Sequence, residues 1–173
     1  MPNRKIFATK RAKAAIAGAA TAIGLAVGTL IMPWEGRSLV AYRDIVGVLT
    51  ICDGDTKNVK PGMRVTAEEC DRRTWTRLQN DYVAPLTKCI PGFEMKPKSW
   101  QASMISLAWN VGVGATCKST AARLAIAGDF QGSCEAATAF NKAGGKVVKG
   151  LQNRREMGDA KRIGEAELCV SGL

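Results

Sequence analysis

Apolar residues are distributed unevenly along the chain, and the longest uncharged stretch lies near its start. Nineteen residues from Ala14 to Met32 carry no charge; seven of them are Ala and three are Gly. As a helix they would span about 28 Å, close to the roughly 30 Å of a hydrocarbon core. Basic residues precede the stretch, which predicts that the N-terminus stays inside and the remainder lies outside. The pattern therefore predicts an N-terminal apolar helix that inserts weakly into a membrane.

Three interpretations of residues 14–32 follow from this composition. A cleaved signal peptide fits because small residues, which favour cleavage, are abundant. A permanent anchor fits the length of the stretch, and a temporary anchor that later leaves the bilayer fits its low content of large apolar residues. The pattern alone leaves all three open.

The apolar stretch gives way to short mixed segments. Residues 34–43 predict a short helix with Leu39 and Tyr42 on one side. Residues 45–51 are β-branched and apolar, as in a strand, and residues 52–56 have the composition of a turn. A small β-hairpin is therefore expected early in the chain.

Helical periodicity dominates the remainder. Thr66, with Glu69 three residues later, forms a capping box that opens a helix with Trp75 and Leu78 on its apolar face. Pro85 should end or kink this helix because it lacks the backbone N–H that a helix needs.

Further helices are expected towards the C-terminus. Residues 99–111 carry apolar side chains at helical spacing, and Ser119 can cap a short helix that stops at Gly128. Two or three more helices fit between residues 130 and 169, around a Gly-Gly turn at 144–145. One small β element followed by helices predicts an α+β fold.

Composition narrows the chemistry. The chain has no histidine, which excludes Ser-His-Asp and Cys-His nucleophile pairs and the common His-based zinc sites. Acid–base chemistry must then come from carboxylates, Lys, Tyr or Cys. A net charge of +10 suits anionic partners such as a cell wall, a membrane surface or nucleic acid. No stacking or groove-binding motif supports nucleic acid, so we expect none as a partner.

The cysteines indicate a disulfide framework. They are even in number and widely spaced, and they contain no C-x-x-C motif of the kind that binds metal. Disulfides imply an oxidising compartment such as the periplasm. The six residues are Cys52, Cys70, Cys89, Cys117, Cys134 and Cys169.

Among the carboxylates, Glu35 and Asp44 differ from the rest. Glu35 follows the long apolar stretch and Trp34, so we expect it to be partly desolvated, which favours the protonated form of a carboxyl group. Asp44 leads into the predicted hairpin and can stay ionised. Two carboxyl groups in unlike environments are what glycoside hydrolysis requires. The spacing alone is a weak signal, since any two acids nine residues apart would qualify.

Glu35, eight residues, Asp44, five residues and Thr50 resemble the catalytic spacing of the phage-type lysozymes. Two further motifs in the same order are similar to motifs of that family: Trp-Asn-Val-Gly-Val-Gly at 109–114 and Gly-Leu-Gln-Asn-Arg-Arg-Glu at 150–156. One departure is Asp55, which stands where the family commonly has a histidine. We interpret that position, like Asp53, as part of a turn.

The resemblance implies a phage-lysozyme-like fold with a small β-hairpin lobe and a larger helical lobe. It implies that Glu35 is the general acid, that Asp44 positions water or stabilises positive charge, and that Thr50 helps to hold that water. The bond cut would be the β-1,4 link between N-acetylmuramic acid and N-acetylglucosamine in peptidoglycan, with no cofactor or metal. Whether the configuration is inverted or retained depends on the carboxyl separation.

An apolar N-terminus on such a body resembles the signal-arrest-release endolysins. The resemblance implies an uncleaved segment at residues 1–33 and a catalytic domain at residues 34–173. The segment would tether an inactive enzyme to the host inner membrane through residues 14–32, facing the periplasm, and would later release it there for host lysis. We expect a monomer. This interpretation favours the temporary anchor, because cleavage near residue 32 would leave little chain before Glu35.

Six cysteines allow fifteen connectivities, and we expect the local pairs Cys52–Cys70, Cys89–Cys117 and Cys134–Cys169.

The alternative functions are a lytic transglycosylase, which also uses a Glu acid, and a cationic wall-binding or membrane-disrupting protein without catalysis.

Overall fold

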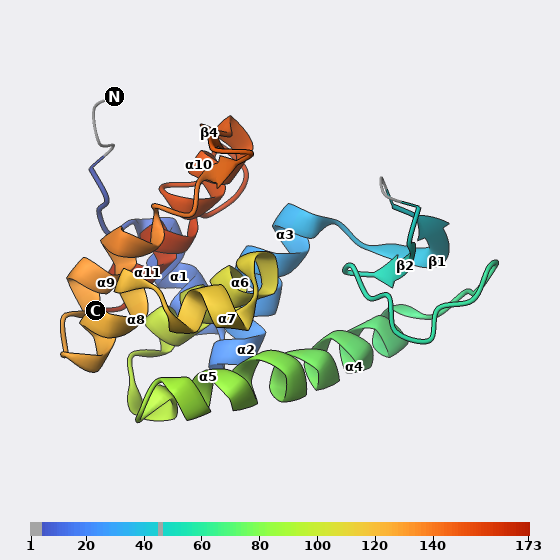
Figure 1. Ribbon diagram of the computed structural model, residues 1–173, viewed down its shortest axis with the longest axis horizontal. Helices are drawn as coiled ribbons and strands as arrows, with labels where there is room; N and C mark the ends of the chain where they lie inside the picture. Colours follow the sequence, from blue (N-terminus) through green and yellow to red (C-terminus); the bar gives the residue numbers. More distant parts are fainter. Residues whose placement is uncertain (1–4, 45–46) are drawn as a thin grey trace.

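A small β-hairpin lobe and a larger helical lobe are joined by one long helical rod in the computed structural model, which describes residues 5–44 and 47–173 (Figure 1). The rod consists of α4 (Ala67–Arg77), the π-helical turn η2 (Leu78–Val83) and α5 (Ala84–Cys89). Its first end lies against the hairpin, and its second end lies under the helical lobe (Figure 1). This arrangement agrees with the expected α+β class.

The hairpin pairs β1 (Ser38–Arg43) with β2 (Leu49–Cys52) in antiparallel fashion. The helix predicted over residues 34–43 is therefore wrong beyond Glu35. Backbone hydrogen bonds to a neighbouring segment explain the difference: Ala41 N–H donates to Met63 O at 2.8 Å, and Val65 N–H donates to Leu39 O at 3.0 Å. The predicted strand at 45–51 is confirmed from Leu49 onward, and its first two residues lie outside the described residues.

The helical lobe is built around α6 (Lys98–Val111), which contains the fully buried Trp100 and Leu107. This confirms the helix predicted at 99–111. Ser119 caps the next short helix as predicted, accepting a hydrogen bond from Ala122 N–H at 3.0 Å. The surrounding elements are η3 (Phe93–Met95), α7 (Val113–Cys117), α8 (Thr120–Ile126), α9 (Phe130–Ala137), β3 (Lys142–Ala143), β4 (Lys146–Val147), α10 (Lys149–Arg155) and α11 (Glu165–Ser171).

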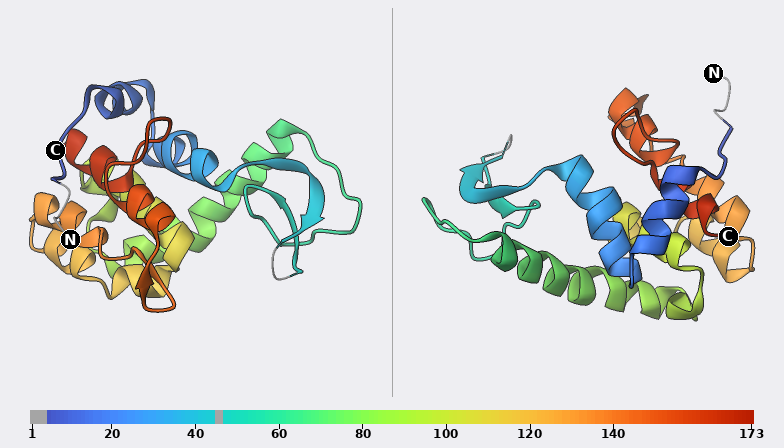
Figure 2. Two further views of the ribbon diagram at one scale, coloured as in Figure 1. Left: turned by 90° about the horizontal axis from the view of Figure 1, so that it is seen from above. Right: turned by 180° about the vertical axis from the view of Figure 1, so that it is seen from behind.

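The N-terminal segment forms part of the core of the helical lobe. It consists of α1 (Lys10–Gly18), α2 (Ala22–Leu25), η1 (Ala26–Ile31) and α3 (Met32–Glu35). Leu25, Leu30 and Ile31 are at most 1% exposed. Both views in Figure 2 place α1 beside α11, at the C-terminus. The single helix expected over residues 14–32 is thus divided, because extended backbone at Ala19 ends α1 before Thr21 caps α2. Across the described parts of the chain, no helix combines the length and apolarity needed to cross a membrane.

Both π-helical turns lie just before a proline. Met32 N–H donates to Val27 O ahead of Pro33, and Ala84 N–H donates to Gln79 O ahead of Pro85. A proline cannot donate to the carbonyl four residues earlier, and its ring collides with that carbonyl. Widening the preceding turn shifts the hydrogen bonds to a five-residue spacing and lets each helix continue. Pro85 therefore reshapes its helix without ending it.

Three disulfides connect the elements in the expected local pairs. Cys52–Cys70 joins β2 to α4, Cys89–Cys117 joins α5 to α7, and Cys134–Cys169 joins α9 to α11. The first belongs to the hairpin lobe and the other two to the helical lobe, so each lobe has covalent support of its own.

Candidate active site

Glu35 is the last residue of α3, where the chain leaves the helical lobe for the hairpin. Gly36 follows with φ +78°, a conformation that favours glycine, and its N–H closes the last helical turn on Met32 O at 3.1 Å. The Glu35 side chain is 29% exposed. The predicted partial desolvation of Glu35 is confirmed.

Arg154 fixes one oxygen of this carboxyl group. Arg154 Nη1 lies 2.6 Å from Glu35 Oε1, and the arginine, from the last turn of α10, is 5% exposed. A charge-assisted hydrogen bond of this length is strong and directional. Arg154 belongs to the 150–156 motif, but no separate role for it was predicted from the sequence.

A buried acid holds Arg154 from behind. Glu165, at the start of α11, is 1% exposed, and its Oε1 lies 3.3 Å from Arg154 Nε. Ser106 Oγ donates to the same oxygen at 2.7 Å, and Arg155 forms an ion pair with Oε2. Pairing of this kind offsets part of the desolvation cost of buried charges, although Arg154 Nη2 has no hydrogen-bond partner among the described residues. The network therefore limits how far the Arg154 guanidinium can move, and with it Glu35.

Asp44 and Thr50 lie on the other lobe, within the hairpin. Asp44 follows β1, and its Oδ1 accepts a hydrogen bond from Val48 N–H at 2.8 Å. Thr50, on β2, is 4% exposed, and its hydroxyl donates to Val48 O at 3.1 Å. Since that proton is used, the lone pairs of Thr50 Oγ1 remain available to accept. The structure brings Asp44 and Thr50 together around Val48 and places Glu35 across the lobe junction.

The two-residue connection between Glu35 and β1 is anchored at its second residue. Arg37 binds Asp53 through two hydrogen bonds, Nε to Oδ1 at 2.9 Å and Nη2 to Oδ2 at 2.7 Å. Asp53 is fully buried and also accepts from Thr74 Oγ1 of α4 at 2.8 Å. The predicted turn location of Asp53 is confirmed, and its carboxylate ties the connection to the rod.

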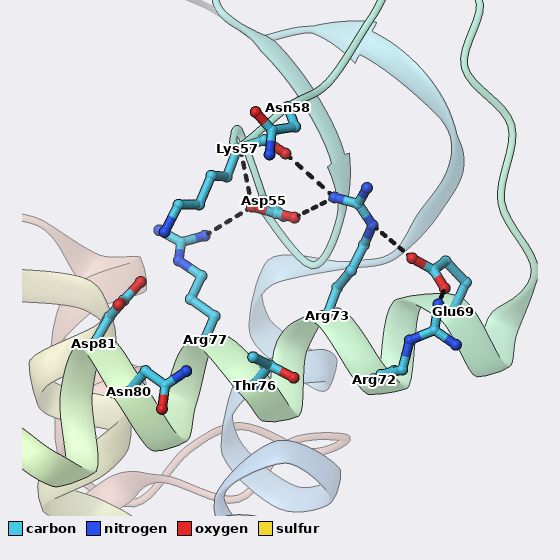
Figure 3. Close-up of a pocket in the computed structure, with 10 residues that line it drawn as sticks. All are labelled: Asp55, Lys57, Asn58, Glu69, Arg72, Arg73, Thr76, Arg77, Asn80 and Asp81. Atoms are coloured by element: carbon cyan, nitrogen blue, oxygen red, sulfur yellow. Dashed lines mark hydrogen bonds and ion pairs between the residues drawn. The ribbon is translucent and has the colours of Figure 1, made fainter.

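A cavity of about 330 Å³ lies between the rod and the turn after β2 (Figure 3). Asp55 reaches into it with 6% exposure and pairs with Arg73 at 2.8 Å. Arg77 donates to Gly54 O at 2.9 Å and lies over the Trp109 ring at 4.6 Å, so it bridges the hairpin and the helical lobe. The close-up shows the charged groups turned towards one another. We therefore assign this cavity to the lobe interface and not to the reacting centre.

Asp55 has a structural place, as expected for the position where the family commonly has a histidine. Within residues 5–44 and 47–173, no group of three or more Cys, Asp or Glu is arranged to hold a metal ion.

The chain is similar to phage endolysins in sequence and structure. Residues 32–158 match the phage lysozyme family. A SAR-endolysin of Enterobacteria phage P21 is 35% identical over 140 residues, covering 80% of this chain and 78% of the relative. A SAR-endolysin of Pseudomonas phage phiKMV is 37% identical over 142 residues, covering 80% and 84%.

Solved structures agree with this similarity. The endolysin from Escherichia coli O157:H7 phage FAHEc1 superposes with a TM-score of 0.67 at 26% identity, covering 99% of this chain and 96% of that one. The active form of the phage P1 endolysin Lyz shares the fold, with a TM-score of 0.66 at 22% identity and coverage of 98% and 97%. The family match spans well over half of the sequence, including Glu35, Asp44, Thr50 and Arg154. The chain belongs to the phage lysozyme family.

Proposed function

We propose that the protein is an endolysin muramidase (lysozyme, EC 3.2.1.17) that hydrolyses the β-1,4 bond between N-acetylmuramic acid and N-acetylglucosamine in peptidoglycan. The observation that carries the proposal is the Glu35 carboxyl group, held at the lobe junction by the buried Arg154. The membership of this protein in the phage lysozyme family supports peptidoglycan as the substrate and host lysis as the outcome.

The proposed chemistry divides between the two lobes. Arg154 occupies Glu35 Oε1, which leaves Oε2 to carry the proton that passes to the glycosidic oxygen as the C1–O bond breaks. A water molecule adds to C1 from the hairpin side and gives its proton to Asp44, while Thr50 Oγ1 accepts the other water proton as a hydrogen bond. Asp44 also stabilises the positive charge that develops on the sugar ring.

Exchange of Glu35 tests this function. Glu35→Gln keeps the shape of the side chain but removes the transferable proton, so we expect lysis of outer-membrane-permeabilised Gram-negative cells to fall about 10²–10⁴-fold. Glu94→Gln, at an exposed carboxyl on η3, is the matched control and should lyse normally. Undiminished lysis by a folded Glu35→Gln protein would favour a cationic membrane-disrupting protein.

Product analysis distinguishes hydrolysis from the transglycosylase alternative. Hydrolysis adds water and leaves a reducing muramic acid, whereas a lytic transglycosylase leaves a 1,6-anhydro end. We expect reducing ends, and anhydro ends would contradict the role given to Asp44 and its water.

We further propose that residues 1–33 tether the inactive enzyme to the inner membrane, facing the periplasm, before release. Two observations support the tether: residues 14–32 are uncharged, and the matched relatives are named SAR-endolysins. The same residues supply buried side chains to the folded protein, so the segment suits a membrane and a protein core equally. In this proposal residues 34–173 carry the catalytic site, and the released enzyme is a monomer.

Cell fractionation tests the tether. We expect the full-length, uncleaved protein in the membrane fraction until the membrane potential is collapsed, and in the soluble periplasmic fraction afterwards. A protein that is soluble from the start, or shortened near residue 32, would contradict it.

A further inference from the structure

Arg11 of α1 is bound on the catalytic body by four hydrogen bonds. Its Nε and Nη2 each lie 2.7 Å from one carboxylate oxygen of Glu167, on α11. Its Nη1 donates to Asp159 O at 2.8 Å, and Nη2 also donates to Met157 O at 2.9 Å. The two carbonyls come from the loop between α10 and α11. Three separate acceptor groups of the body thus converge on one guanidinium group.

The acceptor side of this contact is built into the body. The Glu167 side chain has no solvent exposure, and its Oε2 accepts a hydrogen bond from Gly164 N–H at 3.2 Å. The loop that presents the carbonyls is held by its own ion pair, Asp159 with Arg162 at 2.5 Å. A bidentate carboxylate flanked by carbonyls matches the planar donor fork of a guanidinium group and suits an ammonium group poorly.

Thr9 extends the same contact to the start of α1. Its hydroxyl donates to Glu167 Oε1 at 2.7 Å and also accepts from Ala12 N–H, which caps the helix. Its backbone N–H donates to Ser171 Oγ at 3.0 Å. Docking of Arg11 and initiation of α1 therefore occur at one place.

We propose that Glu167 and the carbonyls of Met157 and Asp159 form a guanidinium-binding site that captures Arg11 and latches the N-terminal segment onto the catalytic body. Given the proposed tether, this site stands empty of Arg11 while the segment spans the membrane, and it fills on release. The latch joins one end of the segment to α11, while Glu35 lies at the other end. Glu165, which orients Arg154 and through it Glu35, is also on α11. The same helix therefore holds both ends of the N-terminal segment.

Chemical rescue of purified protein tests the site without any membrane. Arg11→Ala should lower the melting temperature by about 2–4 °C. Guanidinium chloride at about 50 mM, far below the molar range that unfolds proteins, should restore part of that loss relative to the same concentration of sodium chloride. Lys13→Ala removes the same charge from an exposed position of α1 and is the control. Guanidinium should not raise the melting temperature of the wild type or of Lys13→Ala relative to sodium chloride.

Hydrogen exchange separates local undocking from general destabilisation. In Arg11→Ala we expect faster amide exchange in residues 10–18, with unchanged protection in α6. Equal melting temperatures for Arg11→Ala and Lys13→Ala, or no difference between guanidinium and sodium, would overturn the latch. Arg11→Lys should show only partial recovery, because one ammonium group cannot reproduce the fork.

Release from the membrane, measured by cell fractionation, should differ between Lys13→Ala and Arg11→Ala. Removing a positive charge eases passage of the N-terminus across the membrane, so Lys13→Ala should release at least as well as wild type. Arg11→Ala also loses the latch and should release less than Lys13→Ala. If fractionation finds no tethered form but guanidinium rescue succeeds, the tether fails and the guanidinium site stands. If fractionation finds a tethered form but guanidinium rescue fails, the tether stands and the guanidinium site fails.

Discussion

Arg154 gives the proposed acid a fixed orientation because its guanidinium group binds two carboxylates with different atoms. Nη1 meets Glu35 and Nε meets Glu165. A lysine in its place carries all its donors on one nitrogen and cannot reproduce the fixed spacing of the two arginine donors. We predict that Arg154→Lys lowers the catalytic efficiency on soluble peptidoglycan fragments at least about tenfold, mainly through kcat, because Glu35 loses its fixed position.

A stability measurement accompanies this prediction. Arg154→Ala leaves the buried Glu165 short of a partner and should cost about 3–5 kcal/mol of unfolding free energy, measured by denaturant titration. Arg123→Lys, at an exposed position on α8, should leave both activity and stability unchanged. A fully active, folded Arg154→Lys enzyme would show that Glu35 needs no such support.

Glu167 makes the latch sensitive to acid. Burial raises its pKa, but hydrogen bonds from Arg11, Thr9 and Gly164 outweigh burial, so the pKa lies below the ordinary value of 4.5. A lowered folded-state pKa adds stability that is complete above the unfolded value and is lost as the pH falls through the folded value. The neighbouring Asp159 has a pKa of about 2, because of hydrogen bonds from Arg162 and Lys161, and stays ionised throughout.

We therefore predict a difference in acid stability between wild type and Glu167→Gln. As the pH falls below about 4.5, the wild type should lose more stability than Glu167→Gln, which has no carboxyl group to protonate there. Thermal melting at a series of pH values measures this. Parallel pH profiles for the two proteins would mean that Glu167 contributes no acid sensitivity.

At the scale of elements, the hairpin lobe depends on its disulfide. Among the described residues, its fully buried apolar cluster consists of Ile51, Cys52 and Cys70, a small core beside which the disulfide is a large contribution. The bond closes a loop with a sequence separation of 18, worth about 3 kcal/mol in the chain-entropy estimate. Replacing both cysteines by Ala should therefore unfold the hairpin first.

Hydrogen exchange of the double variant measures that loss. We expect β1 and β2 to exchange rapidly while α6 stays protected, and we expect lysis to fall because Asp44 and Thr50 lose their positions. The Cys89, Cys117 double alanine variant is the comparison, and its hairpin should stay protected. One cooperative loss of protection across both lobes would contradict an independent hairpin.

The elements also show what the sequence could predict. Disulfide pairing, the 99–111 helix and the Ser119 cap depend on local spacing and were confirmed. The helix over residues 34–43 was wrong because Leu39 and Tyr42 are at helical spacing, whereas pairing with the distant residues 63–65 selects a strand. Tertiary contacts of this kind leave no local signal.

Some residues of the candidate site could be predicted from the sequence, and others only from the folded structure. Glu35, Asp44 and Thr50 lie within sixteen residues, and they could be named because their spacing resembles the catalytic spacing of the phage-type lysozymes. Arg154 lies 119 residues from Glu35 along the chain, so only the folded structure shows that it binds this acid. Glu165 and Glu167 carry no motif, and their roles follow from burial and partners alone.

At the scale of the whole molecule, the N-terminal segment is part of the folding unit of the protein. Between residues 5 and 33 the chain supplies four large aliphatic side chains that are at most 7% exposed: Ile23, Leu25, Leu30 and Ile31. At roughly 1.5–3 kcal/mol each, their burial is worth about 6–12 kcal/mol as an upper estimate. The total stability of a domain is only about 5–15 kcal/mol.

We predict that a chain beginning at residue 34 does not fold. The control is a chain beginning at residue 20, which loses α1 but keeps all four core side chains and should unfold cooperatively on heating. Circular dichroism and lysis assays measure both. A folded, lytic chain from residue 34 would support the cleaved signal peptide, because maturation would then leave a complete enzyme.

Substitution of two glycines in the segment should raise its affinity for the membrane without disturbing its packing in the folded protein. A Cβ built at Gly18 or Gly28 meets no atom within 4 Å, and both residues are exposed, so we expect the folded protein to tolerate leucine at either position. In the membrane each leucine gains roughly 1.5–3 kcal/mol by leaving water. We predict that the Gly18→Leu, Gly28→Leu double variant stays in the membrane fraction after the potential is collapsed.

The same double variant, purified in folded form, should lyse permeabilised cells as well as wild type, since both positions are exposed in the folded protein. Serine at both positions is the control for substitution itself and should release normally. Release of the leucine variant at the wild-type rate would mean that membrane affinity of residues 14–32 does not govern the enzyme. Retention together with full activity of the purified protein would place the control of lysis in the partition of one segment between bilayer and protein core.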